Sequence, residues 1–237
     1  MDKLLVDSLK ELNININEKQ IEQFFCYKDI LIEWNKKVNL TAITEEREIV
    51  IKHFVDSVSV LNKVDIPLNA SIIDVGTGAG FPGIPLKIMR SDLEVTLLDS
   101  LNKRVEFLNH SCQQLQLEHV NNIHLRAEDG GQNPLLREKF DFCVSRAVAN
   151  LSVLSEYCLP FIKIGGSFVA LKGPDVTEEL GEGKKAIFEL GGRVKKVEKI
   201  EIPNSDIVHS VVIIEKVSKT PKNYPRKAGT ATKNPIK

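Results

Sequence analysis

The sequence predicts an α/β protein built on a mostly parallel, seven-stranded sheet, preceded by an N-terminal extension of helices. Two observations predict this class. After Ile66 and Pro67, short continuous apolar runs alternate with helical stretches, as in parallel sheets covered by helices on both faces. Before that point, apolar residues follow helical spacing and no strand-like alternation of useful length occurs. The seven strand candidates are 71–75, 94–98, 122–125, 140–144, 167–171, 193–202 and 208–215.

Helix signals occupy the N-terminal region and the stretches between the first strand candidates. In residues 18–37, apolar side chains recur close to the i, i+3, i+4 spacing of a helix. Asn17, with Gln20 three residues later, predicts a capping box at the start of this helix. A second helix is expected to cover part of residues 46–62. The helices expected between strands are 84–90, 102–116 and 151–161.

The end of the chain carries two further signals. The last two strand candidates are separated by the turn-forming residues 203–206, which predicts an antiparallel hairpin at the edge of the sheet. From Ser218 onward the chain is rich in Pro, Lys, Thr and Gly, which is typical of a loop or mobile segment. The chain is therefore expected to comprise a helical subdomain, an α/β domain and a basic C-terminal tail, at residues 1–65, 66–217 and 218–237.

Composition excludes several classes of protein. Of 237 residues, 42% are hydrophobic and 27% charged, so the chain can bury a sizeable core and is not wholly disordered. No stretch approaches 18 uncharged apolar residues, and the N-terminus lacks the apolar region of a secretory signal. The four cysteines are scattered and form no CxxC pair, which argues against a disulfide framework or a zinc site and for a reducing, cytoplasmic location.

The net charge is zero, but the charge is unevenly distributed. Residues 216–237 carry seven basic and no acidic residues, so the rest of the chain holds 25 basic against 32 acidic residues. A basic tail on an acidic body indicates an anionic partner, most commonly a nucleic acid. A solvated tail that only aids solubility explains the composition equally well, and composition alone leaves both interpretations open.

The strongest local signal is the glycine-rich turn after the first strand candidate. Gly76, Gly78 and Gly80 lie between an apolar strand and a helix, where glycine lets the chain bend sharply and lets a ligand contact the main chain. The next strand runs into Asp99, whose carboxylate can accept hydrogen bonds from both ribose hydroxyls of an adenosine ligand. A helix cap is the ordinary alternative for a single Asp at this position. This order of strand, glycine turn, helix, strand and acid can bind either NAD or S-adenosylmethionine.

Two details favour S-adenosylmethionine over a nicotinamide cofactor. Read directly after the strand, the pattern is GxGxG, and Phe81 stands where a dinucleotide site has its third glycine. A dehydrogenase also needs a substrate domain, and we expect none after residue 215. A phosphate-binding P-loop is excluded because Lys185, not Ser or Thr, follows Gly183 and Lys184.

The chain resembles a known family well beyond the glycine turn. The matching blocks are NLTAI at 39–43, HFVDS at 53–57, DVGTGAGFPG at 74–83, LLDS at 97–100, KRV at 103–105, RAE at 126–128, SRA at 145–147, LKG at 171–173 and YPRKAG at 224–229. In this order, over about 190 residues, they are similar to the bacterial small-subunit ribosomal RNA methyltransferase G family, also called glucose-inhibited division protein B. The FPG, SRA and YPRKAG blocks are far more specific than the glycine pattern.

This resemblance implies a class I, Rossmann-like methyltransferase domain, S-adenosylmethionine as methyl donor, and N7 of one guanine in 16S rRNA as acceptor. The partner is then 16S rRNA or the small ribosomal subunit. By position, the resemblance assigns cofactor binding to Gly76, Phe81, Ala127, Glu128 and Arg146, and the turn and strand end add Gly78 and Asp99. It assigns activity or RNA contact to Arg126, Arg146 and Lys172.

The residues agree with a guanine N7 acceptor. N7 carries a free lone pair at neutral pH, so its methylation requires alignment rather than a general base or a covalent nucleophile. A cytosine C5 enzyme needs a nucleophilic cysteine, often after proline, and no cysteine here follows one. An exocyclic-amine enzyme is expected to show an Asn/Asp-Pro-Pro-aromatic block where this chain reads SRAV at 145–148. A methyltransferase acting on a small molecule or a protein remains the alternative.

Further expectations concern contacts within the site and with partners. Arg146 is expected to lie between the cofactor and the base. His53 and Asp56 fall on one face of a helix and are expected to form a hydrogen-bonded structural pair that joins the N-terminal helices to the sheet; a pair that supports the site from beneath is the alternative. We expect no metal, no membrane association and a monomer. The residues expected to contact RNA phosphates together with the tail are Lys103, Arg104 and Lys172.

Overall fold

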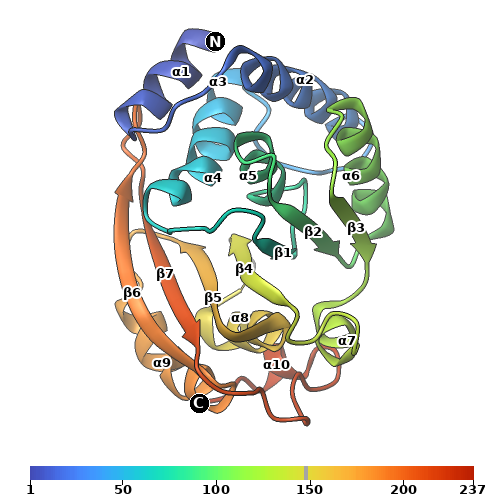
Figure 1. Cartoon of the computed structure of the whole chain (residues 1–237), viewed down its shortest axis with the longest axis vertical. Helices are drawn as coiled ribbons and strands as arrows, with labels where there is room; N and C mark the ends of the chain where they lie inside the picture. Colours follow the sequence, from blue (N-terminus) through green and yellow to red (C-terminus); the bar gives the residue numbers. More distant parts are fainter. Residues whose placement is uncertain (147–148) are drawn as a thin grey trace.

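Seven strands form one sheet in a computed structural model of the chain, which describes residues 1–146 and 149–237 (Figure 1). The strand order is β3-β2-β1-β4-β5-β7-β6, and neighbours are parallel except that β7 is antiparallel to both β5 and β6. The predicted α/β class and the terminal hairpin are therefore confirmed. The strands are β1 (Ser71–Val75), β2 (Glu94–Asp99), β3 (Val120–His124), β4 (Phe140–Arg146), β5 (Ile162–Lys172), β6 (Gly192–Glu201) and β7 (Val208–Lys216).

Helices pack on both faces of this sheet, and each face has its own hydrophobic cluster. Ile72 and Ile73, neighbours on β1, belong to different clusters, because successive side chains of a strand point to opposite faces. The first cluster packs the helices from α1 through α6 against one face of the sheet, and the second packs α8 and α9 against the other face. The α-helices are α1 (Asp2–Glu11), α2 (Glu18–Asn35), α3 (Glu46–Ile49), α4 (Asp56–Ser59), α5 (Gly83–Met89), α6 (Asn102–Gln114), α7 (Ala127–Gln132), α8 (Leu151–Cys158), α9 (Thr177–Glu189) and α10 (Thr230–Lys233).

The N-terminal helices confirm the local signals of the sequence. The capping box of α2 is present: Gln20 N donates to Asn17 Oδ1 at 3.0 Å, and Asn17 N donates to Gln20 Oε1 at 2.9 Å. Between α3 and α4 the chain forms a π-helical stretch (Val50–Val55), and a 3₁₀ turn (Val60–Asn62) follows α4. Such π-helical stretches are frequent at functional sites. The division of the chain at residues 65 and 217 stays a prediction.

Residues 217–229 form no helix or strand, as expected of a loop, but the segment is packed against the domain rather than detached from it. It folds back across α7, α8 and α9, and a short helix, α10, lies near its end (red in Figure 1). Thr220, Ala231 and Ile236 are buried there. The Arg137 guanidinium donates to carbonyl oxygens of Thr220 at 2.8 Å and Tyr224 at 2.7 Å. These partners lie more than 80 residues away, so local composition carries no sign of them.

Two general features concern the described part of the chain only. Within residues 1–146 and 149–237, no helix combines the length and apolar character needed to cross a membrane. The same residues contain no group of three or more His, Cys, Asp or Glu side chains placed to hold a metal ion.

Candidate active site

The glycine turn forms a loop at the carboxyl end of β1 that is fixed from below by Asp74. Asp74 Oδ2 accepts hydrogen bonds from Thr77 Oγ1 at 2.7 Å and from Gly83 N at 2.8 Å, so one carboxylate holds both ends of the loop. At Gly78 the backbone is left-handed, with a φ of 60°, and the space that a Cβ would fill is open. Only a glycine combines this backbone with room for a ligand to approach.

Asp74 is also a buried acid beneath the loop, and one of its two oxygens has no partner among the described residues. The side chain is fully buried, and burial raises its pKa to about 7. Its Oδ1 atom has no hydrogen-bond partner among the described residues. A cationic group bound at the loop would favour the ionised carboxylate and offset its burial.

Asp99, at the end of β2, is engaged by the main chain. Its Oδ2 accepts from Gly78 N at 2.9 Å and its Oδ1 accepts from Leu101 N at 2.9 Å, just before α6. Arg104 Nη1 lies 3.4 Å from Oδ2, and Asp99 is almost fully buried. The structure therefore uses Asp99 to couple the glycine loop to α6, and its contact with a ribose stays a prediction.

A cavity of about 240 Å³ opens beyond the carboxyl ends of β1 and β2. It brings together three of the predicted cofactor residues, Gly76, Ala127 and Glu128, with the exposed Arg126. Residues far along the chain close the other side. The complete lining is Val75, Gly76, Leu98, Ser100, Leu125, Arg126, Ala127, Glu128, Tyr157, Gly229 and Thr232.

Arg146, at the carboxyl end of β4, is held in a network of hydrogen bonds. Its Nη1 donates to Asp56 Oδ2 and to Lys52 O, both at 2.9 Å, and its Nη2 donates to His53 Nδ1 at 3.0 Å. The guanidinium carbon lies 5.0 Å from the centroid of the Phe81 ring. His53 and Asp56 thus join the N-terminal helices to the sheet as expected, but among the described residues they do not bond to each other as a pair: each bonds to Arg146 instead.

His53 is neutral, and its hydrogen bonds fix its tautomer. Burial, with the nearby Arg146 charge, lowers its pKa to about 3. Because a guanidinium only donates, Nδ1 accepts, and Nε2 carries the proton and donates to Thr41 Oγ1 at 2.9 Å. The imidazole stacks on Phe81, with 4.5 Å between ring centroids and an interplanar angle of 18°.

The other predicted basic residues lie in different surroundings. Lys172 Nζ donates to Ala149 O at 2.8 Å and pairs with Glu179 Oε2 at 2.7 Å, with only 7% of its side chain exposed. It therefore braces the chain after β4, whereas Arg126 lies at the rim of the cavity. Ala147 of the SRA block and the neighbouring Val148 lie outside the described residues.

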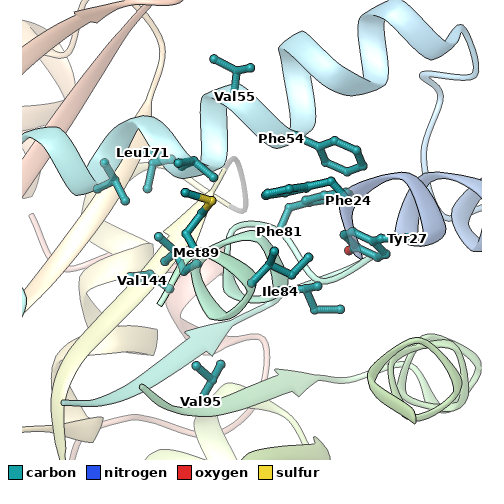
Figure 2. Packing of buried hydrophobic residues seen from close by; sticks show 14 of the residues in the cluster. Phe24, Tyr27, Phe54, Val55, Phe81, Ile84, Met89, Val95, Val144 and Leu171 are labelled. Carbon is teal, nitrogen blue, oxygen red and sulfur yellow. The ribbon is translucent and has the colours of Figure 1, made fainter. Parts of the chain in front are cut away.

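Two residues of the site, Tyr27 and His209, carry no functional signal in the sequence. Tyr27 of α2 donates its hydroxyl to Ala79 O of the glycine loop, and its ring lies among Phe24, Phe54 and Phe81 (Figure 2). His209 of β7 bonds through Nδ1 to Asp56 Oδ1. Tyr27 lies three residues after Phe24 on the apolar face of α2, which is the only signal that sequence gives for it.

The fold and the site define a class I methyltransferase: a seven-stranded sheet with an antiparallel β7, a glycine loop after β1 and an acid after β2. A similar fold occurs in geranyl diphosphate C-methyltransferase from Streptomyces coelicolor, in complex with Mg²⁺, geranyl diphosphate and S-adenosyl-L-homocysteine (TM-score 0.56, 12% identity, covering 81% of this chain and 98% of that chain). Residues 20–208 match the family model described as rRNA small subunit methyltransferase G, and the chain belongs to this family.

Relatives at high identity lead to the same family. Proteins named ribosomal RNA small subunit methyltransferase G from Alkaliphilus metalliredigens and Clostridium perfringens are 54% and 52% identical over 234 residues. In both cases the match covers 99% of this chain and 98% of the relative. The family predicted from the sequence blocks is therefore confirmed, as is the class I fold. The individual site residues stay predictions.

Proposed function

We propose that this protein transfers the methyl group of S-adenosylmethionine to N7 of a guanine in 16S rRNA, as a monomer in the cytoplasm. Membership of the rRNA small subunit methyltransferase G family supports the class of reaction and substrate. The names of these relatives favour rRNA over the alternative acceptors, a small molecule or a protein. One structural observation supports N7 as the methylated atom. The side chains near Phe81 that could accept a proton are already hydrogen-bonded to other protein groups.

Those groups are His53 and Asp56. Both ring nitrogens of His53 are in hydrogen bonds, one of them from Arg146. Both oxygens of Asp56 are bonded as well, to Arg146 and to His209. An exocyclic amine or a hydroxyl would have to lose a proton on methylation, and both side chains are buried and already engaged in hydrogen bonds within the protein. Guanine N7 requires no such step.

The residues at the glycine loop fit S-adenosylmethionine. When bound, this cofactor supplies an electrophilic methyl group on a positively charged sulfur. The open main chain at Gly78 and the buried carboxylates of Asp74 and Asp99 suit a ligand that carries positive charge near the loop. Gly76, Ala127 and Glu128 line a cavity for the nucleoside end. Phe81 packs against both His53 and Arg146, which lie side by side, and so links the glycine loop to the end of β4.

The acceptor side is organised for alignment. Arg146 is fixed by three partners from the N-terminal helices, so the Phe81 ring and the end of β4 keep one arrangement. Such fixed geometry lets sulfur, methyl and N7 come into line, which is the main contribution needed when no proton moves.

Fewer basic residues of the tail are available for RNA contact than the sequence suggested. Lys216 is fully buried, and Arg226 is paired with Glu156, so neither is free for phosphates. The tail residues that keep exposed charges are Lys219, Lys222, Lys227, Lys233 and Lys237. Their contacts with phosphates predict RNA binding that weakens steeply with salt concentration.

A methylation assay tests the proposal. The protein is incubated with S-adenosylmethionine carrying a labelled methyl group and with small ribosomal subunits or naked 16S rRNA. We expect label at one guanine, detected as a single strand break after borohydride reduction and aniline treatment, which cleave at N7-methylguanosine. Label on an exocyclic amine or at cytosine C5, or label found only in small molecules, would contradict the proposal.

A further inference from the structure

The C-terminal segment lines part of the cavity beyond the carboxyl ends of β1 and β2. Two of the residues that line the cavity, Gly229 and Thr232, lie more than 100 residues after Ala127 and Glu128 on the opposite wall. Gly229 ends the YPRKAG block, but neither residue is among those that the sequence assigned to cofactor binding. The cavity is therefore closed by the last turn of the chain.

Two hydrogen bonds fasten this wall. Gly229 N donates to Glu128 Oε1 at 2.9 Å, and the Tyr157 and Thr232 hydroxyls lie 3.1 Å apart. The only hydrogen bond of the Glu128 carboxylate within the described part of the chain is through Oε1, and Glu128 lines the cavity, so Oε2 is left for a ligand. Polar groups from α7, α8 and α10 therefore converge on one small space.

Stronger contacts hold the segment immediately before the wall. The Arg226 guanidinium forms three hydrogen bonds of 2.6–3.2 Å with Glu156, which is almost fully buried. Pro225 packs so closely on α7 that a Cβ added at Gly131 would lie 2.7 Å from its Cγ. Because α7 begins with Ala127 and Glu128, the segment and the predicted cofactor residues occupy one rigid arrangement.

We propose that residues 226–233 form part of the methyl-donor site, with Gly229 and Thr232 contacting the nucleoside end of the donor opposite Ala127 and Glu128. This inference rests on the proposed function. The walls match a nucleoside: Leu98 and Ala127 offer apolar surface for a flat base. The Thr232 hydroxyl and Glu128 Oε2 supply partners for its amino and hydroxyl groups.

Hydrogen–deuterium exchange of the full chain tests the inference directly. S-adenosylhomocysteine at saturating concentration is expected to slow amide exchange at least fivefold in residues 229–234 as well as in the loop 76–81. The hairpin turn 203–206 serves as the internal control and should be unchanged. Protection of 76–81 with no change in 229–234 would overturn the inference and leave the proposed function intact. No protection in either segment would overturn both.

A matched pair of substitutions gives a second test. Ala231 is 1% exposed, and α10 packs on α8, so Ala231→Glu should displace α10 from the wall. Asn223 is exposed and lies outside residues 226–233, so Asn223→Glu adds the same charge to the same segment away from the wall. Calorimetric titration with S-adenosylhomocysteine should show the Kd raised at least tenfold by Ala231→Glu and less than twofold by Asn223→Glu. Equal affinities in a folded Ala231→Glu variant would overturn the inference.

Thr232→Val keeps the test decisive if Ala231→Glu does not fold. This change removes one hydroxyl and preserves the shape of the side chain. We expect a threefold or larger rise in Kd for S-adenosylhomocysteine with an unchanged unfolding midpoint. A Kd within error of the parent protein, together with unchanged exchange in residues 229–234, would overturn the inference.

Discussion

Replacing Arg226 with methionine should strongly destabilise this protein, because it leaves a carboxylate buried without its counter-charge. Glu156 is 1% exposed and receives three hydrogen bonds from the Arg226 side chain and one from its main-chain nitrogen. Arg226→Met removes the charge and the three side-chain bonds while preserving much of the apolar stem. Breaking a buried ion pair from one side costs about 3–5 kcal/mol in the free energy of unfolding.

Chemical denaturation monitored by circular dichroism measures this change. The matched control is Arg193→Met, since Arg193 pairs with Glu215 at 2.8 Å and its side chain is 70% exposed. Exposed pairs contribute little, so the control should leave the unfolding midpoint nearly unchanged. Adding Glu156→Gln to Arg226→Met should restore more than half of the lost stability. An Arg226→Met variant as stable as Arg193→Met would refute the assignment of this pair as a buried anchor.

Three other predictions concern the site. Arg146→Ala should cut methyl transfer by orders of magnitude while circular dichroism shows a folded protein, and near-normal turnover would reject its positioning role. Burial lowers the pKa of His53 from 6.5 to about 3. Between these pH values the unfolded chain binds a proton at this residue and the folded chain does not. The folded protein therefore loses stability as pH falls from about 7 towards 3. The free-energy difference between the parent and His53→Gln, from urea unfolding at several pH values, should therefore shrink on acidification; a constant difference would contradict a neutral buried His53. Burial raises the pKa of Asp74 from 3.8 to about 7, so the folded protein loses stability as pH rises between these two values. The stability of Asp74→Asn relative to the parent should therefore increase between pH 4 and pH 8. A stability difference that does not change with pH would contradict the raised pKa of this carboxyl.

The elements that sequence predicted well are those with local signals. The cap at Asn17 and Gln20 depends on residues three apart, and the strands are recognisable from short runs of neighbouring residues. Helix α9 was missed because Gly181 and Gly183 interrupt its helical pattern. Gly183 is buried there, and a Cβ at this position would lie 3.3 Å from Leu151 of α8. The glycine that weakens the local signal is the one that permits close packing of two helices.

For the site, too, only the residues with local sequence signals could be predicted. The glycine loop and Asp99 were visible because they follow strands in a fixed order along the chain. The network around Arg146 was visible only in part, since Asp56 and His209 lie 153 residues apart and meet only in the folded sheet. The YPRKAG block marked Gly229 as part of a family pattern, but its contact with Glu128 could not be predicted, because the two residues are separated by 101 positions. Long-range pairs of this kind are set by topology rather than by spacing.

Closure of the cavity by the last turn of the chain has a consequence for synthesis. During translation the sheet strands leave the ribosome well before residues 226–233, so a nascent chain has its glycine loop long before it has a complete donor site. A late frameshift or a premature stop near Arg226 would then yield a protein with all seven strands and a weakened hold on its methyl donor. Because Ile236 is buried, an affinity tag fused directly behind it would press on the same region, and a tag at the N-terminus is the better choice for measuring donor affinity.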